Sequence, residues 1–218
     1  MPDHGQRWVV LDVGETIIDE SRTWRAWADE LGVPQLTFMS IFGAIVARGQ
    51  GYGHITDYIA VDDWRRHHDA VEARLGGFQP EDVYPDVLSS LAGLRTRGYR
   101  VAVIGNQPAE RKPQLRALGV EAEIMAMSEE MGAMKPDPDF FALTLSLLGD
   151  PDPGRVAYVG DRIDNDVMPA AAAGMRAVWL RRGPWGIVPQ HEPEQAALVV
   201  GSLSELVERI DEAWFSAS

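Results

Sequence analysis

Three aspartates of this chain stand where a carboxylate could do chemistry. Asp12 directly follows a short apolar run, Trp8 to Leu11, and Asp161 follows a second such run and a glycine, with Asp166 shortly after it. The carboxyl ends of parallel strands meet at one edge of a sheet, so these side chains could lie together although they are far apart in sequence. Carboxylates gathered there would repel one another unless a cation bound. Mg²⁺ suits such a site because it takes oxygen ligands, so we predict Mg²⁺ as the cofactor.

The same residues lie in a series of motifs. These are Asp12-Val13-Gly14-Glu15-Thr16, Gly105-Asn106, Lys135-Pro136, and Gly160-Asp161 with Asp166. In this order they resemble the motifs of the haloacid dehalogenase (HAD) superfamily of hydrolases. That family reads D-x-D-G-T, then Ser or Thr after the next motif strand, Lys before Pro, and G-D followed by D. The resemblance covers nearly the whole chain and points to a branch with a helical C1-type cap and D-V-G-E-T in place of D-x-D-G-T.

The resemblance implies a nucleophile and a set of metal ligands. Asp12 would attack phosphorus and form an aspartyl-phosphate, which splits one hard step into two easier ones. Asp12 and Asp161 would bind Mg²⁺ together with the main-chain carbonyl of Gly14, and Asp166 would complete the metal site by orienting a metal-bound water. Asp164, next to these residues, is better explained as an acid favoured at a helix N-terminus.

The resemblance also implies a site for the phosphoryl group. Lys135 would offset the charge of the transferring group, and this chain has only one other lysine, Lys112. Gly105 and Asn106 would bind phosphate through main-chain N–H groups or through the Asn106 amide. We therefore predict Asp12 and Lys135 as catalytic residues, with Gly105, Asn106 and Lys135 binding phosphate.

Two of the motifs depart from the family pattern. Gly14 replaces the second aspartate, the general acid that protonates the leaving oxygen, and Gly105 replaces a Ser or Thr hydroxyl. Loss of general acid help typically costs 10²–10⁴-fold in rate. Glu15 is adjacent to Gly14, but neighbouring side chains usually point apart, so we do not predict it as the substitute acid.

Related activities can be tested against the sequence. A phosphonoacetaldehyde hydrolase needs a cap lysine, and residues 19–83 contain none. A phosphomutase needs the missing aspartate. A 2-haloacid dehalogenase is less favoured because those enzymes work without metal and lack the Gly-Asp pair kept here. The prediction is a Mg²⁺-dependent phosphatase of small phosphorylated metabolites, with a catalytically weak or non-enzymatic phosphate-binding or regulatory protein as the alternative.

The rest of the chain supplies the elements that would position these residues. Residues 84–218 alternate short apolar runs with amphipathic segments, which predicts a doubly wound α/β fold with a parallel sheet covered on both faces. Residues 19–83 contain only helical patterns. We therefore predict a core of residues 1–18 and 84–218, with a helical cap of residues 19–83 inserted after the first strand.

The predicted cap contains a glycine-rich loop at residues 47–54, with helical segments expected at 55–60 and 62–75. Arg48, Tyr52 and His54 in this loop are candidates for substrate specificity, because Arg48 could grip an anion and His54 could exchange protons near neutral pH. An ordinary solvated loop is an equally good interpretation. Trp185, in a Pro- and Gly-rich connection, could pack between cap and core.

Composition limits the partners and the location. The net charge of −13 argues against a nucleic-acid partner, and with no cysteine the chain can form no disulfide or thiolate metal site. The first residues lack the features of a signal peptide, and no apolar run approaches the length of a membrane span. We expect a cytoplasmic protein that binds a small phosphorylated substrate but no membrane, as a monomer or homodimer.

Overall fold

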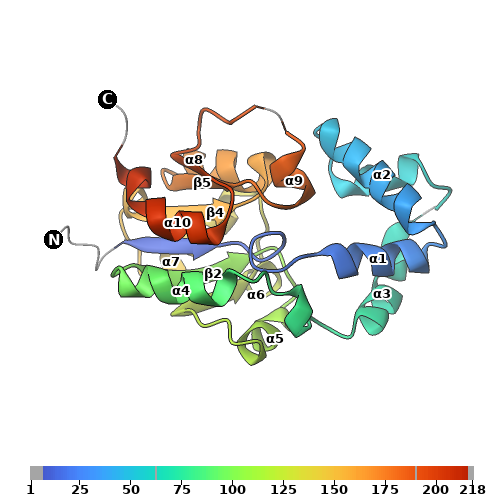
Figure 1. The fold of residues 1–218 in the computed structure, drawn as a ribbon, viewed down its shortest axis with the longest axis horizontal. Coiled ribbons are helices and arrows are strands. Elements are labelled where there is room, and N and C mark those ends of the chain that lie inside the picture. Colours follow the sequence, from blue (N-terminus) through green and yellow to red (C-terminus); the bar gives the residue numbers. More distant parts are fainter. Residues whose placement is uncertain (1–6, 62, 190, 216–218) are drawn as a thin grey trace.

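The computed structural model describes residues 7–61, 63–189 and 191–215, and its centre is a sheet of six parallel strands in the order β3-β2-β1-β4-β5-β6. In chain order the strands are Trp8–Leu11 (β1), Arg100–Gly105 (β2), Ile124–Met127 (β3), Val156–Gly160 (β4), Arg176–Leu180 (β5) and Leu198–Val200 (β6). This arrangement confirms the predicted doubly wound α/β fold (Figure 1). The strand β1 is central. Leu11, its last residue, is paired with Val103 of β2 and with Val159 of β4, so both neighbouring strands extend to the residue just before Asp12.

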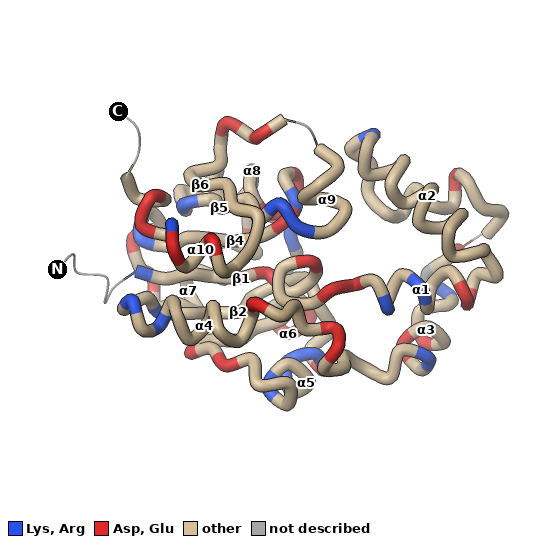
Figure 2. The backbone as a smooth tube through the Cα atoms, in the orientation of Figure 1, with Lys and Arg blue, Asp and Glu red and all other residues tan. Residues whose placement is uncertain are grey.

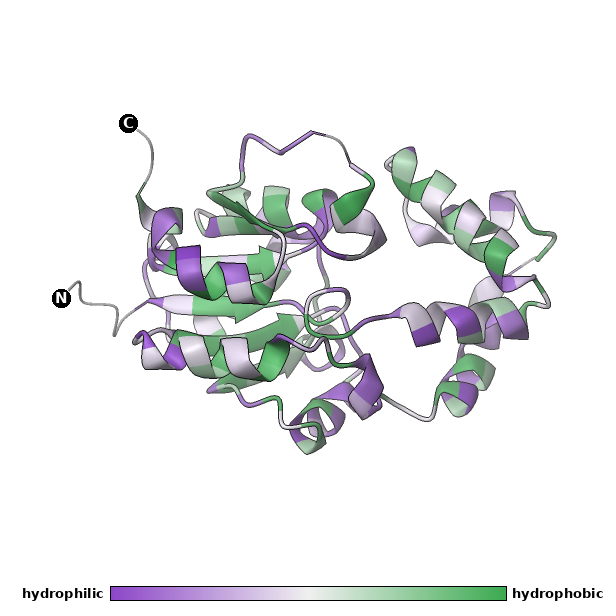
Figure 3. Cartoon of the chain, viewed as in Figure 1, coloured by the Kyte–Doolittle hydropathy of each residue, from purple (hydrophilic) through white to green (hydrophobic). Residues whose placement is uncertain are grey.

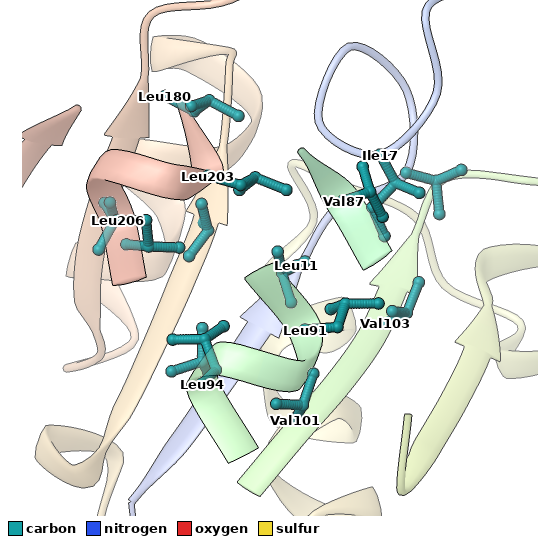
Figure 4. Packing of buried hydrophobic residues seen from close by; sticks show 14 of the residues in the cluster. Leu11, Ile17, Val87, Leu91, Leu94, Val101, Val103, Leu180, Leu203 and Leu206 are labelled. Carbon is teal, nitrogen blue, oxygen red and sulfur yellow. The ribbon is translucent and has the colours of Figure 1, made fainter. Parts of the chain in front are cut away.

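Both faces of the sheet are buried because the side chains of β1 alternate between two apolar clusters. Val9 and Leu11 belong to one cluster, whereas Trp8 and Val10 belong to the other. Figure 4 shows the first cluster, in which side chains of β1 and β2 pack against leucines of the helices α4 and α10. Each fully buried aliphatic side chain contributes roughly 1.5–3 kcal/mol. The helices of this part are Val87–Thr96 (α4), Arg111–Ala117 (α5), Ser128–Met131 (α6), Pro138–Leu147 (α7), Met168–Ala172 (α8), Gly183–Ile187 (α9) and Leu203–Arg209 (α10).

A separate helical unit follows β1, and we call it the helical insertion. Its helices are Ser21–Glu30 (α1), Gln35–Ala47 (α2) and His68–Leu75 (α3), with two short 3₁₀ segments at Tyr52–Asp57 and Trp64–His67. It has its own small apolar cluster, built around Trp27, Phe38 and Ile45. The insertion lies beyond the carboxyl ends of the strands, and Figure 3 shows apolar and polar residues alternating along its helices.

Several elements differ from the sequence expectation. The segments expected to be helical at 55–60 and 62–75 form 3₁₀ turns followed by the shorter α3. The segment after Asp161 begins as a single π-helical turn, Ile163–Val167, and the α-helix Met168–Ala172 follows it with Pro169 in its first turn. The connection around Trp185 contains the short helix α9, also with a proline in its first turn, where the missing N–H costs nothing.

The passage from β1 to α1 is acidic. Glu15, Asp19 and Glu20 lie on it. Figure 2 shows red, acidic segments where the tube leaves the core for the insertion. Among the described residues, no single helix is both long and apolar enough to cross a membrane, although α1 and α2 together meet that test by length and composition, with a bend of 115° between them.

Candidate active site

The site is centred on a buried lysine between two aspartates. The Lys135 Nζ lies 2.7 Å from Asp12 Oδ1 and 2.6 Å from Asp166 Oδ1, and all three residues are buried. Asp12 is fixed by its position after β1, where its N–H donates to the Val159 carbonyl (2.9 Å). Asp166 is fixed through its other carboxylate oxygen, which accepts from the Arg162 N–H (2.9 Å). The structure thus brings Asp12 together with two residues that lie more than 100 positions further along the sequence.

Asn106 holds the segment that carries Lys135. Its Nδ2 donates to the Lys135 carbonyl (2.9 Å), and its Oδ1 accepts from the Lys135 N–H (2.8 Å). The side-chain amide is therefore engaged with this segment, and it positions the lysine. Main-chain groups of Gly105 and Asn106 remain the candidates for the predicted phosphate contact.

Two glycines allow the charged side chains to lie this close to the strand ends. A Cβ added to Gly105 would lie 2.3 Å from Asp12 Oδ1, and one added to Gly160 would lie 2.3 Å from Asp166 Oδ2. A Ser or Thr at position 105 would collide with the nucleophile candidate in this arrangement. Gly105 in the second motif therefore does two things: it removes the hydroxyl, and it leaves the space that the Asp12 carboxylate occupies.

The residues predicted to bind metal fit a cation. Asp12, Asp161 and Asp166 can each offer one carboxylate oxygen within 4.8 Å of the others. Asp161 Oδ2 is buried and has no hydrogen-bond partner, which is costly for a carboxylate oxygen unless a cation meets it. Both oxygens of Asp166 already accept hydrogen bonds, which suits an orienting role better than direct ligation. Gly14 lines the same cavity as Asp12 and Asp161.

The electrostatics of the site follow from burial and from the crowding of like charges. Burial raises the pKa of Asp12 to about 6; Lys135 opposes this shift and Asp166 adds to it. Burial and the carboxylates of Asp166 and Asp12 likewise raise the pKa of Asp161. Burial alone would lower the pKa of Lys135, but Asp12 and Asp166 outweigh it and hold this pKa well above its ordinary value. The lysine is therefore a permanent cation, while the aspartates need a further positive charge to be ionised together.

Sequence reasoning missed Glu20. A Cβ added to Gly14 would lie 2.6 Å from Glu20 Oε1 and 2.9 Å from its carboxyl carbon, so Glu20 occupies the space that a side chain at position 14 would fill. Burial, followed by the charges of Glu15 and Asp12, raises the pKa of Glu20 to about 8. The only sign of this role in the sequence is that two acidic residues, Asp19 and Glu20, follow the altered first motif.

Glu15 is placed differently from Glu20. It adopts a left-handed backbone conformation (φ 49°), which is uncommon for a residue other than glycine, and the family has glycine at this position. Its carboxylate accepts hydrogen bonds from the Tyr84 hydroxyl (2.5 Å) and from the Glu20 N–H (3.1 Å). Glu15 thus supports the turn that carries Glu20 toward Gly14.

A cavity of about 680 Å³ extends from these residues to the helical insertion. Of the three predicted specificity residues, only Tyr52 is among its described lining residues. Arg48 and His54 are exposed and have their own partners, the Tyr58 hydroxyl and the Asp57 carboxylate. Trp185 lines the cavity and packs edge-on against Phe42 of α2, with ring centroids 5.9 Å apart, so it does lie between core and insertion.

Several named sequence relatives of this chain are phosphatases. The chain is 31% identical over 199 residues to the phosphoglycolate phosphatase of Cupriavidus necator, covering 80% of each chain. It is 32% identical to the glyceraldehyde 3-phosphate phosphatase of Methanopyrus kandleri and 35% identical to the phosphoserine phosphatase of Thermus thermophilus. These two matches cover 59% and 57% of this chain and only 57% and 49% of the relatives, about half of their length.

Solved structures share the fold. The HAD-hydrolase YfnB of Bacillus subtilis, determined bound to magnesium, matches with a TM-score of 0.72 at 16% identity, covering 94% of this chain and 98% of that chain. The β-phosphoglucomutase of Clostridium difficile matches with a TM-score of 0.67 at 16% identity, covering 96% and 97%. At these identities the likeness concerns the fold alone.

A family profile described as haloacid dehalogenase-like hydrolase matches residues 6–174, well over half of the chain. This segment contains the residues that converge at the sheet edge: Asp12, Gly105, Asn106, Lys135, Asp161 and Asp166. The chain therefore belongs to the haloacid dehalogenase-like hydrolases.

Proposed function

We propose that this protein is a Mg²⁺-dependent phosphatase of small phosphorylated metabolites that uses Asp12 as its nucleophile. The observation that carries this proposal is the contact of Lys135 with both Asp12 and Asp166, beside the unpaired oxygen of Asp161 and at the inner end of a cavity. The named phosphatase relatives support the same reaction class. The helical insertion would act as the cap that covers the cavity.

The first step would transfer the phosphoryl group to the protein. A carboxylate oxygen of Asp12 attacks phosphorus, the bond between phosphorus and the ester oxygen breaks, and the departing oxygen takes up a proton. Lys135 offsets the charge of the transferring group. Asp12, Asp161 and the Gly14 carbonyl would hold Mg²⁺, whose contribution is to neutralise negative charge on the phosphoryl oxygens.

The second step would release phosphate. Water attacks the phosphorus of the aspartyl-phosphate, the bond between phosphorus and the Asp12 oxygen breaks, and inorganic phosphate leaves. Asp166 keeps Lys135 in place throughout, because its Oδ1 accepts from the lysine (2.6 Å). Asp12 is then ready for another cycle.

The proton for the departing oxygen would come from Glu20, and the Glu20 carboxylate would then take a proton from the water that attacks in the second step. Glu20 Oε1 and the carboxyl carbon lie within 3 Å of where the side chain of a residue at position 14 would begin, and Glu20 lines the cavity together with Asp12. Glu15 is less suited because two donors already engage its carboxylate. The carboxyl of Glu20, the residue just before α1, would thus replace the carboxyl that the first motif lacks at Gly14.

The test measures phosphate release from acetyl phosphate and from a panel of phosphate monoesters, with Mg²⁺ and with a chelator, for wild type and Asp12→Asn. We expect Mg²⁺-dependent release that Asp12→Asn abolishes. A wild type that binds Mg²⁺ yet leaves even acetyl phosphate intact would overturn the enzymatic proposal and favour a phosphate-binding protein. Metal-independent halide release from a 2-haloacid would instead support the dehalogenase alternative.

A further inference from the structure

The wall of the cavity opposite Asp12 is unusually rich in aromatic rings. Four of the seven tryptophans of the chain line the cavity, together with Tyr52 and Phe78. Three of the tryptophans come from the helical insertion and one from α9 in the core. The four are Trp24, Trp27, Trp64 and Trp185.

The rings of the insertion form one connected surface. Tyr52 lies 5.9 Å from Trp24 and 5.6 Å from Trp64 between ring centroids, and Trp64 lies 5.0 Å from Trp27. Trp24 is anchored from behind by Phe42 of α2, at 4.4 Å. Tyr52 remains 39% exposed, and Trp24 and Trp64 are only partly buried. An aromatic surface thus faces a cavity that also contains the charged groups of the site.

The lysine and arginine side chains that line this cavity, among the residues the structure describes, all have carboxylate partners. Arg111 pairs with Glu72 (2.5 Å) and Arg162 with Asp164 (2.7 Å), and Lys135 contacts two aspartates. The two arginines also lie over rings, Arg111 over Phe78 (4.5 Å) and Arg162 over Trp185 (4.0 Å).

Carboxylates outnumber these cations along the same lining, with five acidic side chains against three lysine or arginine side chains. In the proposed enzyme Mg²⁺ would offset Asp12 and Asp161 and Glu20 would hold a proton, so what disfavours a carboxylate on the substrate is that each of the three cations already has a carboxylate partner. The five acidic residues are Asp12, Glu15, Glu20, Glu72 and Asp161.

We infer that the site accepts phosphate monoesters whose alcohol part is a flat, uncharged aromatic group. The phosphate would lie at Asp12 and Lys135, and the ring would pack against Tyr52, Trp24 and Trp64. A cavity of about 680 Å³ has room for such a molecule. This inference rests on the proposed phosphatase function, and the inferred substrates differ from the small polar phosphates after which the three relatives reported above are named.

The experiment measures binding without turnover. Isothermal titration of the Asp12→Asn variant in Mg²⁺ compares 1-naphthyl phosphate, 2-phosphoglycolate and inorganic phosphate. Stacking of one ring on an aromatic surface strengthens binding roughly 5- to 150-fold, so we expect the naphthyl ester to bind at least about fivefold more tightly than phosphoglycolate. Adding Tyr52→Leu or Trp64→Leu should remove about tenfold of affinity for the naphthyl ester and leave the affinity for inorganic phosphate unchanged.

The control is Phe215→Ala, which removes an aromatic side chain that is 71% exposed and does not line the cavity. It should leave all three affinities unchanged, and melting curves should show that the Tyr52 and Trp64 variants remain folded. Phosphoglycolate binding as tightly as the naphthyl ester, or an unchanged naphthyl affinity in both ring variants, would overturn this inference alone. If neither the Asp12→Asn variant nor the wild type binds inorganic phosphate in Mg²⁺, the proposed function fails and the inference fails with it.

Discussion

The two ends of the cavity are built in different ways. At the sheet edge, charged side chains follow the ends of β1 and β4 or come from the adjoining loops and first turns, and glycines let them approach within hydrogen-bond distance. At the helical insertion, the wall consists of aromatic rings held by helix packing and by one glycine-flanked loop. The first end is fixed by strand register, whereas the second depends on how three short helices pack.

This difference assigns the two ends different tasks. A buried lysine is tolerated here because it contacts a carboxylate on either side, and such an arrangement is well suited to holding reacting groups in place. The partly exposed rings of the insertion do not depend on paired charges, and they can pack against different flat groups. We therefore expect the sheet edge, together with Glu20 from the passage into α1, to carry the chemistry, and the rings of the cavity wall to select the substrate.

The largest effect is expected at the sheet edge. Asp12→Asn should reduce phosphate release on the order of 10⁴-fold or more, because the nucleophile is lost while the fold is kept. The matched control is Asp164→Asn, which makes the same change at a nearby exposed aspartate outside the cavity lining and should reduce activity by no more than a few-fold. Activity of Asp12→Asn within tenfold of wild type would exclude Asp12 as the nucleophile.

A smaller and more selective effect is expected for Glu20→Gln. Phenyl phosphate and benzyl phosphate form a matched pair, since the rings are alike but the benzyl alkoxide is a far poorer leaving group. Hydrolysis of benzyl phosphate should fall roughly 10²-fold, whereas that of phenyl phosphate should change only a few-fold, because the proton matters most for the poorer leaving group.

A double variant that combines Gly14→Asp with Glu20→Ser tests the same role by moving the carboxyl group from position 20 to position 14. Gly14 does not have a left-handed φ, so the obstacle to a side chain there is Glu20 itself. Removing the Glu20 carboxyl while supplying a new one from position 14 should restore much of the lost benzyl phosphate hydrolysis. Equal losses for both esters in Glu20→Gln, with no rescue, would show that Glu20 only supports the fold.

Metal binding should produce a moderate effect on stability. Millimolar Mg²⁺ should raise the melting temperature by several degrees, because a ligand at 100 times its Kd adds about 2.7 kcal/mol to the free energy of unfolding. Asp161→Asn should abolish this increase, since it removes the carboxylate whose buried oxygen has no other partner. Melting temperatures that are the same in Mg²⁺ and in chelator would contradict the metal site.

The smallest effects are expected for Arg48→Ala and His54→Ala. Both side chains are exposed, and neither is among the described residues that line the cavity. Exposed substitutions usually change free energies by no more than about 0.5 kcal/mol, so kcat/KM for naphthyl phosphate should change less than about threefold. A larger change, or a changed preference among esters, would support the specificity role predicted from the sequence over the aromatic wall.

The sequence by itself determined the fold class and the position of the candidate site at the sheet edge. The apolar run of β1, buried on both faces, ends at Asp12, and a second run ends at Gly160-Asp161, so the sheet edge could be predicted from local patterns. Lys135 was identifiable because it belongs to an ordered set of motifs. These features depend on residues that are close in sequence, or on the general rule that parallel strands share one edge.

Only the tertiary structure decided how the altered positions are compensated. Glu20 reaches the space beside Gly14 because the chain turns at Glu15 before α1 begins, and Asn106 is engaged with the main chain of Lys135 rather than directed to a ligand. The packing of α1 against α2 and α3 likewise brings Tyr52 to the cavity and leaves Arg48 and His54 on the surface. Such placements follow from contacts between distant segments, which no local pattern of residues specifies.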